Sequence, residues 1–227
     1  RFGESRCSIP PLDHTDEPQD NGAKLVARCR EHNAIMIPHH VGWTGTDWEN
    51  HDPEIQPLVE IVSVHGAMEH MGNRPIPHRG GMRGHFVQDA LAKGIRVGII
   101  GGSDCHGLIW HHKMSRKRDA YRAGLAVLLA PDLSRQSLFH AMKKRRAYGT
   151  TGIKPRIDFR VNNHLFGEEI QVTRPEVQIR GQVIAQHDLK WLQVVKDNQI
   201  WYEYGGEGYI SRFSVTDTDL TPGLHWY

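Results

Sequence analysis

The 227-residue sequence has few cysteines, little net charge and no long hydrophobic run. Its three cysteines cannot all pair with one another, and their spacing matches neither a disulfide framework nor a zinc finger. No apolar stretch reaches the roughly 20 residues that a membrane-spanning helix needs, and no signal peptide is visible. The sequence therefore predicts neither a membrane span nor a disulfide-stapled domain, and nothing in it specifies a cellular compartment or an oligomeric state.

The formal net charge is only +2, which argues against nucleic acid or an acidic membrane as a partner. The one compact basic run, KKRR at 143–146, closes a predicted helix, where positive charge complements the helix dipole. A small anionic molecule is a better match to the chain than a nucleic acid.

Apolar periodicity divides the sequence into two parts, 1–153 and 154–227. In the first part, helical patterns alternate with short apolar runs, which is typical of an α/β fold with a parallel sheet or barrel. Ser134 is expected to cap the last of these helices, with Leu133 as its hydrophobic staple. We expect helices over 22–32, 84–93 and 135–146, and strands over 34–38, 58–64, 95–100, 124–130 and 147–152.

The second part shows no helical period, and turn signals separate its strand-like runs. This pattern predicts a small antiparallel β-sandwich-like domain, and its last residues, 224–227, resemble a strand that is cut short. The expected strands cover 156–162, 176–185, 190–196, 199–204 and 208–215.

The most unusual feature of the composition is its 16 histidines, several of which follow predicted strands. Because the carboxyl ends of parallel strands meet on one face, the side chains that follow them should converge. Imidazole and carboxylate ligands suit zinc, manganese or iron. Taken singly, the His39-His40 pair could be an ordinary loop at a strand end. Glu60 lies within the apolar run LVEIV, and because burying a lone carboxylate is costly, its side chain should face either solvent or a partner. The candidate ligands at the strand ends are His39, His40, Glu60, His65, Asp104 and His106.

Four segments, IPHHVG, PLVEIVSVHGAME, GGSDCHG and YRAGLAVLLAPDLSRQSLFHAMKKRRAYGTTG, resemble the PHP (polymerase and histidinol phosphatase) superfamily, and more closely its DUF3604 branch. The resemblance covers about residues 34–170 and extends into the β-rich tail. It implies a distorted (β/α)7 TIM-like barrel, of which this chain carries a part, with two or three divalent metal ions.

Position by position, the resemblance implies that His39, Glu60, Asp104 and His106 are metal ligands, with His65 a further ligand or a hydrogen-bond partner of one. It also matches Glu69 and Arg122 to an acid and a rim arginine of the branch, which we take as catalytic candidates. We add His40, Arg79 and His112 as candidates for binding a substrate's negative charge.

The chain departs from the superfamily pattern at two places. It contains no H-x-H, which the superfamily carries after its first strand, and we expect that segment to lie upstream of Arg1. Cys105 stands where the branch often has asparagine. The chain is therefore expected to carry only part of a metal site.

The function predicted from these residues is metal-dependent hydrolysis, foremost of a phosphoester by a metal-bound hydroxide at a di- or trinuclear site. The same ligands would also serve an amidohydrolase-like ester or amide hydrolase. A third interpretation is a non-catalytic module that binds metal structurally and stacks a carbohydrate on strand aromatics. The aromatics considered for that stacking are Trp191, Trp201, Tyr202 and Tyr204.

Overall fold

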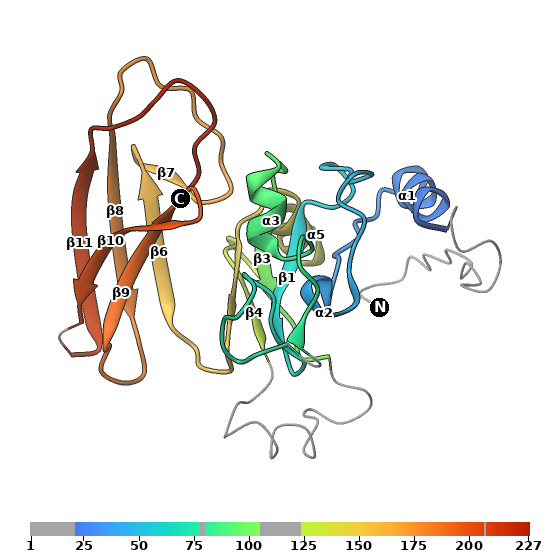
Figure 1. The fold of residues 1–227 in the computed structure, drawn as a ribbon, viewed down its shortest axis with the longest axis horizontal. Coiled ribbons are helices and arrows are strands. Elements are labelled where there is room, and N and C mark those ends of the chain that lie inside the picture. Colours follow the sequence, from blue (N-terminus) through green and yellow to red (C-terminus); the bar gives the residue numbers. More distant parts are fainter. Residues whose placement is uncertain (1–20, 78–79, 105–123, 207) are drawn as a thin grey trace.

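The computed structural model describes residues 21–77, 80–104, 124–206 and 208–227 (Figure 1). It has a mixed α/β architecture in which short helices accompany the first strands, and only strands follow from residue 156 onward. Within the described ranges, no helix combines the length and the apolar character needed to cross a membrane.

The first part is built on a three-stranded sheet in the order β2-β1-β3. β1 and β3 run parallel, with Leu58 opposite Gly98, and β2 pairs antiparallel with β1. Val41, Val59 and Met68 are fully buried in the core beneath this sheet. The elements up to this point are α1 (Asn21–Glu31), α2 (Val41–Thr44), β1 (Leu58–Ser63), β2 (Gly66–Ala67), α3 (Val87–Ala92) and β3 (Gly98–Gly101).

The strand expected over 34–38 does not form, and that prediction was wrong. The segment lies beside the start of β1, and single hydrogen bonds fix it: Met36 N donates to Ile55 O (2.7 Å) and Glu60 N donates to Pro38 O (2.9 Å). Pro38 has no N–H of its own, so the ladder cannot continue into a regular strand. The segment still delivers His39 and His40 to the end of β1.

An antiparallel pair, β4 (Leu125–Leu128) and β5 (Ala147–Thr150), flanks β3, with α5 (Arg135–Lys143) between its strands in the chain. The backbone of β4 lies so close to β3 that a Cβ at Gly101 would overlap Leu125 O. No closed barrel forms among the described residues. Ser134 caps α5 as expected, accepting from Ser137 N (3.2 Å), but Leu133 is 90% exposed, so the predicted staple was wrong.

The second part is antiparallel throughout, as its sequence pattern predicts. Its four-stranded sheet has the order β11-β8-β6-β7, and β9 and β10 form a separate pair. Tyr202 on β10 stacks on Phe213 on β11, with ring centroids 5.7 Å apart. The strands are β6 (Arg156–Val161), β7 (His164–Leu165), β8 (Val177–Ile184), β9 (Trp191–Lys196), β10 (Gln199–Gly205) and β11 (Ile210–Asp217).

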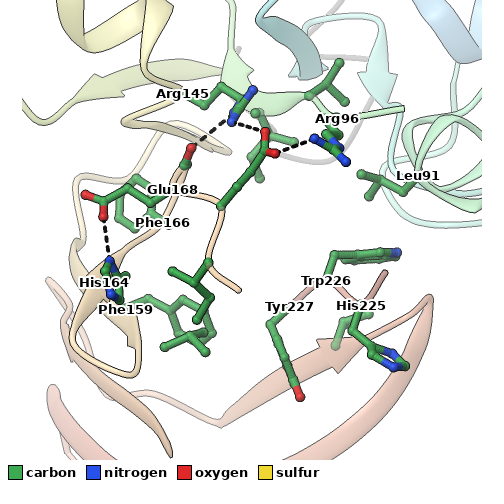
Figure 2. Close-up of a pocket in the computed structure, with 18 of the residues that line it drawn as sticks. Leu91, Arg96, Arg145, Phe159, His164, Phe166, Glu168, His225, Trp226 and Tyr227 are labelled. Atoms are coloured by element: carbon green, nitrogen blue, oxygen red, sulfur yellow. Dashed lines mark hydrogen bonds and ion pairs between the residues drawn. The ribbon is translucent and has the colours of Figure 1, made fainter. Parts of the chain in front are cut away.

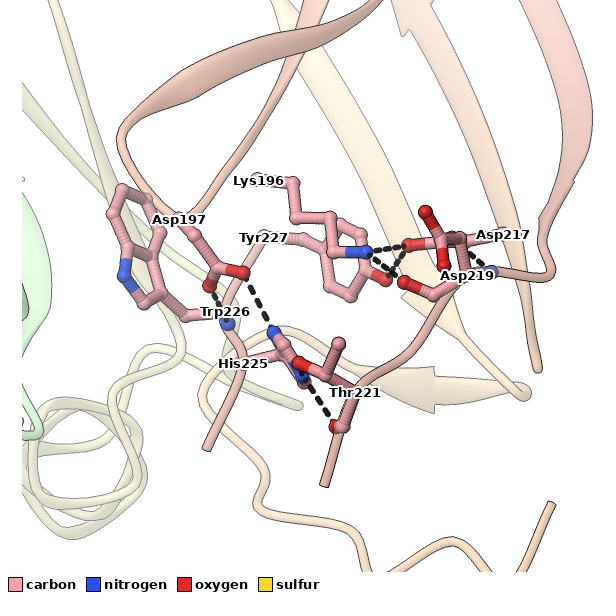
Figure 3. A network of polar contacts seen from close by, with 8 residues as sticks. All are labelled: Lys196, Asp197, Asp217, Asp219, Thr221, His225, Trp226 and Tyr227. Carbon is pink, nitrogen blue, oxygen red and sulfur yellow. Dashed lines mark hydrogen bonds and ion pairs between the residues drawn. The ribbon is translucent and has the colours of Figure 1, made fainter. Parts of the chain in front are cut away.

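A polar network ties the segment after β11 back to the β9–β10 turn (Figure 3). The Asp217 carboxylate is 1% exposed and accepts hydrogen bonds from Lys196 Nζ (2.6 Å) and from the Tyr227 hydroxyl. His225 Nδ1 lies 2.6 Å from Asp197 Oδ2, and Asp197 Oδ1 accepts from the Trp226 amide (3.0 Å). The last residues of the chain are thereby fixed against the strands. We call this group of side chains the C-terminal network.

Candidate metal centre

The ends of β1 and β3 bring two candidate ligands into contact. Val62 of β1 lies opposite Gly101 of β3, so the residues that follow the two strands leave the sheet side by side. His65 Nε2 lies 2.5 Å from Asp104 Oδ2 as a result. Side chains separated by 39 positions in the sequence therefore meet at one point, as the parallel-strand argument predicts.

His40 reaches the same carboxylate from the segment that precedes α2. Its Nε2 lies 3.0 Å from Asp104 Oδ2, and its ring centroid lies 4.6 Å from that of His65. Two imidazoles therefore converge on one carboxylate oxygen. We call His40, Glu60, His65 and Asp104 the strand-end cluster.

Two members of this cluster have left-handed backbone conformations, which are uncommon for residues other than glycine. His40 has φ of 54° and Asp104 has φ of 49°. Such conformations cost about 1 kcal/mol or more each, and they persist where the surrounding structure holds a side chain in a required place. The surrounding structure therefore holds both residues in a backbone conformation that they would otherwise avoid, and this fixes the positions of their side chains.

Glu60 supplies the buried acid of the cluster, and only 7% of its surface is exposed. Burial raises the pKa of Glu60 to about 7, and the nearby Asp104 adds to the rise, while hydrogen bonds from the His40 amide and the Ser63 side chain oppose it. Glu60 Oε1 has no hydrogen-bond partner among the described residues. Gly102 makes room for this carboxylate, because a Cβ there would overlap Glu60 Oε2.

The four residues of the cluster and the neighbouring His39 form two overlapping sets of three donors, with His40 in both. One set adds His39 and Glu60, the other adds His65 and Asp104, and in each set the three donor atoms lie within 4.8 Å of one another. Metal–ligand distances of about 2.0–2.2 Å place neighbouring ligand atoms about 3–3.5 Å apart. The observed spacings are compatible with such a shell after small adjustments. Together with the imidazole and carboxylate chemistry and the unsatisfied Glu60 oxygen, they fit a divalent zinc, manganese or iron ion.

Trp43, in α2, contacts both imidazoles of the cluster. Its ring stacks on His65 with centroids 4.4 Å apart and planes 29° apart, and it lies 5.1 Å from the His40 ring. The indole therefore restricts the rotation of two candidate ligands. Sequence reasoning missed this residue, whose only sequence signal is its position three residues after the histidine pair.

The structure brings His39, His40, Glu60, His65 and Asp104 together in the two donor sets. Of the two roles considered for His40, a metal ligand or a substrate contact, its place in both sets favours the ligand. His39 is exposed and lies at the edge, with its ring 4.2 Å from His40. Glu69 belongs to neither donor set: it accepts from Gln88 Nε2 (3.4 Å) and lines a cavity between the two parts of the chain. The remaining candidates, Arg79, His106, His112 and Arg122, lie outside the described residues.

The chain is similar in sequence to uncharacterized proteins of Chlamydia, and no protein-family model matches it. It is 25% identical to one from Chlamydia trachomatis over 88% of this chain and 34% of the relative. It is 27% identical to another from Chlamydia pneumoniae, over 80% of this chain and 31% of that protein. The chain thus spans about a third of the length of the curated relatives it matches.

The comparison with solved structures found a weak match to a protein from Bacteroides vulgatus. It is described as a two-domain protein containing a predicted PHP-like metal-dependent phosphoesterase. The similarity covers 86% of this chain and 56% of that one, at 13% sequence identity and a TM-score of 0.38. A TM-score this low means that large parts of the two structures do not superimpose.

Proposed function

We propose that this chain carries part of the metal centre of a metal-dependent hydrolase that acts on phosphoesters. The observation that carries the proposal is the convergence of His40 and His65 on Asp104, beside the buried Glu60. A structural role alone gives no reason to hold a buried carboxylate that no lysine or arginine in the described ranges pairs with.

A divalent zinc, manganese or iron ion bound there would activate water and polarise a phosphoryl oxygen. The chain's own residues would do the positioning. His40, His65 and Asp104 would be ligands, and Glu60 and His39 would complete the ligand shell of the metal. Trp43 would fix the orientation of the two imidazoles. We propose two or three ions in the complete protein, with His106 as a further ligand.

The proposed substrate is a small anionic molecule. Arg79, His112 and Arg122 are proposed to meet its negative charge, and Glu69 is proposed to act as an acid or base. The sequence resemblance to the DUF3604 branch of the PHP superfamily supports this assignment. It also supports a barrel completed by residues that this chain lacks and a division into domains near residue 153.

Turnover of p-nitrophenyl phosphate tests the proposal. The chain, assayed together with any sequence that precedes it in the complete gene product and with Zn²⁺, Mn²⁺ or Fe²⁺ added, should release p-nitrophenol, and Asp104→Asn should abolish the release. Asp158→Asn, an exposed acid on β6, is the matched control and should leave the rate unchanged. Metal-independent turnover, or equal rates for Asp104→Asn and Asp158→Asn, would refute it.

The same assay separates ester and amide hydrolysis from phosphoester hydrolysis. p-Nitrophenyl acetate keeps the p-nitrophenol leaving group and a p-nitroanilide releases the chromophore p-nitroaniline, and both substrates replace phosphorus with a carbonyl. Faster metal-dependent turnover of either would favour the amidohydrolase-like alternative. The carbohydrate-binding alternative has less support, because the Trp201 ring contacts Tyr202 and Tyr227, and no ring contact among the described residues joins the 60% exposed Trp191 to them.

A further inference from the structure

A cavity of about 650 Å³ lies between the α/β part and the β part of the molecule (Figure 2). Its walls come from both sides, and many of their large apolar side chains are only half-buried, although Val87 and Val177 are buried. Cavities of this size between two units are a common place for small-molecule sites. The apolar wall includes Leu91, Ile95 and Val97 from α3 and the turn into β3, Phe159 and Phe166 from the β part, and Trp226 from the C-terminal segment.

Two of the lining side chains are more exposed than apolar residues of their size usually are. Val172 is 39% exposed and Leu224 is 58% exposed, and both line the cavity. Exposed apolar surface that gathers around a concave space marks a binding site more often than scattered exposed residues do.

One end of the cavity carries an excess of positive charge. The Glu169 carboxylate lies between two guanidinium groups, with Arg96 Nη1 at 2.5 Å and Arg145 Nη2 at 2.7 Å (Figure 2). Two cations and one anion leave a net charge of +1 at this end. Arg96 is half-exposed, and its other N–H groups can reach a further acidic group.

Counted with Arg146, three arginines (Arg96, Arg145 and Arg146) balance three carboxylates (Glu69, Glu168 and Glu169), so the positive charge belongs to this one end and not to the lining as a whole. Glu168 is paired with Arg146 (3.3 Å) and with His164 (3.0 Å), so its charge is already compensated. Glu69 accepts from the Gln88 side chain at the α3 wall. His225 is engaged by the C-terminal network. The Arg96–Glu169–Arg145 end is therefore where an anion would be attracted.

We propose that this cavity binds a small amphipathic molecule with an aromatic or aliphatic body and one acidic group. The body packs between the α3 side and the aromatic side chains of the β part, and the acidic group binds beside Arg96. None of the four residues of the strand-end cluster lines this cavity. Glu69 does line it, but the acidic group of the ligand is placed beside Arg96, so the proposal does not depend on the hydrolase assignment.

Two fluorescent probes that share an aromatic body test the proposal: 8-anilinonaphthalene-1-sulfonate, which is anionic, and N-phenyl-1-naphthylamine, which is neutral. Both should bind the chain saturably with one site. Arg96→Gln should weaken the sulfonate about fivefold and leave the neutral probe unchanged, because one exposed ion pair contributes up to about 1 kcal/mol. Arg174→Gln, an exposed arginine outside the lining, is the matched control.

A second variant tests the place rather than the charge. Val172→Trp adds an indole at the cavity wall and should weaken both probes more than about tenfold, since the space for their shared body is lost. Non-saturating binding, equal sulfonate affinity in Arg96→Gln and Arg174→Gln, or unchanged binding in Val172→Trp would each overturn the proposal. Arg96→Gln removes one exposed ion pair with Glu169, and Val172 is an exposed residue, so the free energy of unfolding measured by circular dichroism should change by less than about 1 kcal/mol in either variant.

Discussion

The strand-end cluster and the C-terminal network each bury a carboxylate, but the pKa of that carboxylate is raised in the first and lowered in the second. Around Asp217, burial acts to raise the pKa, yet hydrogen bonds from Lys196 and Tyr227 outweigh it, so the pKa lies below its ordinary value. At Glu60, burial dominates and the pKa rises to about 7. One acid is stabilised as an anion within the protein, and the other is not.

The difference separates a structural network from a candidate site. A buried anion that pairs with a cation lowers stability little, and its removal leaves the cation buried without a compensating charge. A buried acid without one lowers stability when it ionises, and proteins retain such groups chiefly where a ligand or a reaction needs them. In the described part of the chain, no lysine or arginine pairs with Glu60, and a divalent cation would supply the missing positive charge.

Breaking the C-terminal network should have the largest effect on stability. Asp217→Asn leaves Lys196, whose side chain is only 12% exposed, without its anion and should lower the free energy of unfolding by about 3–5 kcal/mol. Urea unfolding measures this. Asp158→Asn breaks an exposed pair with Arg160 and should cost less than about 1 kcal/mol. Similar losses in the free energy of unfolding for Asp217→Asn and Asp158→Asn would contradict a stabilising role of the buried pair between Asp217 and Lys196.

Glu60→Gln should act in the opposite direction. The folded state holds this proton up to about pH 7, whereas the unfolded state releases it near 4.5, so stability falls as pH rises through this window. The variant lacks this fall, which corresponds to about 3 kcal/mol at pH 8. When unfolding is measured in EDTA at pH 5 and pH 8, the free energy of unfolding of the variant relative to the wild type should be higher at pH 8 than at pH 5. A variant that is less stable than the wild type at pH 8 would contradict the account of Glu60.

Trp43→Leu should weaken metal binding without removing a ligand. Loss of a residue that orients ligands typically costs about tenfold or more in affinity, and the absorption spectrum of bound Co²⁺ should shift because the imidazoles reorient. Trp191→Leu, which changes an exposed indole, is the control. Equal affinities and spectra in the two variants would remove Trp43 from the site.

His225→Gln should have the smallest effect, and one that depends on pH. The hydrogen bond with Asp197 raises the pKa of His225, and the Thr221 carbonyl adds to it. The resulting stability is present below pH 6.5 and is lost as pH rises through the folded-state pKa. The variant should therefore lose less than about 1 kcal/mol at pH 6 and less still at pH 9. An equal loss at both pH values would mean that the charge on His225 does not contribute.

Local patterns predict the elements of this fold better than its long-range contacts. The apolar runs at 58–64 and 95–100 correspond to β1 and β3, and their parallel pairing follows from the helix between them. The run at 34–38 looks the same in sequence but pairs only through isolated hydrogen bonds. Periodicity does not distinguish these cases, because strand formation depends on neighbours that are distant in the chain.

The candidate site was predictable where a residue conflicts with its local sequence environment. Glu60 is an acid within an apolar strand, and Asp104 follows two glycines at a strand end. The central place of His40 was not predictable, because it depends on a left-handed backbone conformation and on the packing of Trp43. The C-terminal network escaped prediction too, because it joins Lys196 to residues that reach it only after β11 has paired.

Zinc binding by the chain tests the central claim most directly. Equilibrium dialysis against Zn²⁺ alone, with metal counted by mass spectrometry, should find a tight site that is lost in Asp104→Asn and in His40→Ala. It should be retained in His187→Gln, which removes an exposed histidine of the β part. Zinc that binds with the same stoichiometry and affinity in all four proteins, or that does not bind at all, would contradict the assignment of the strand-end cluster as a metal centre.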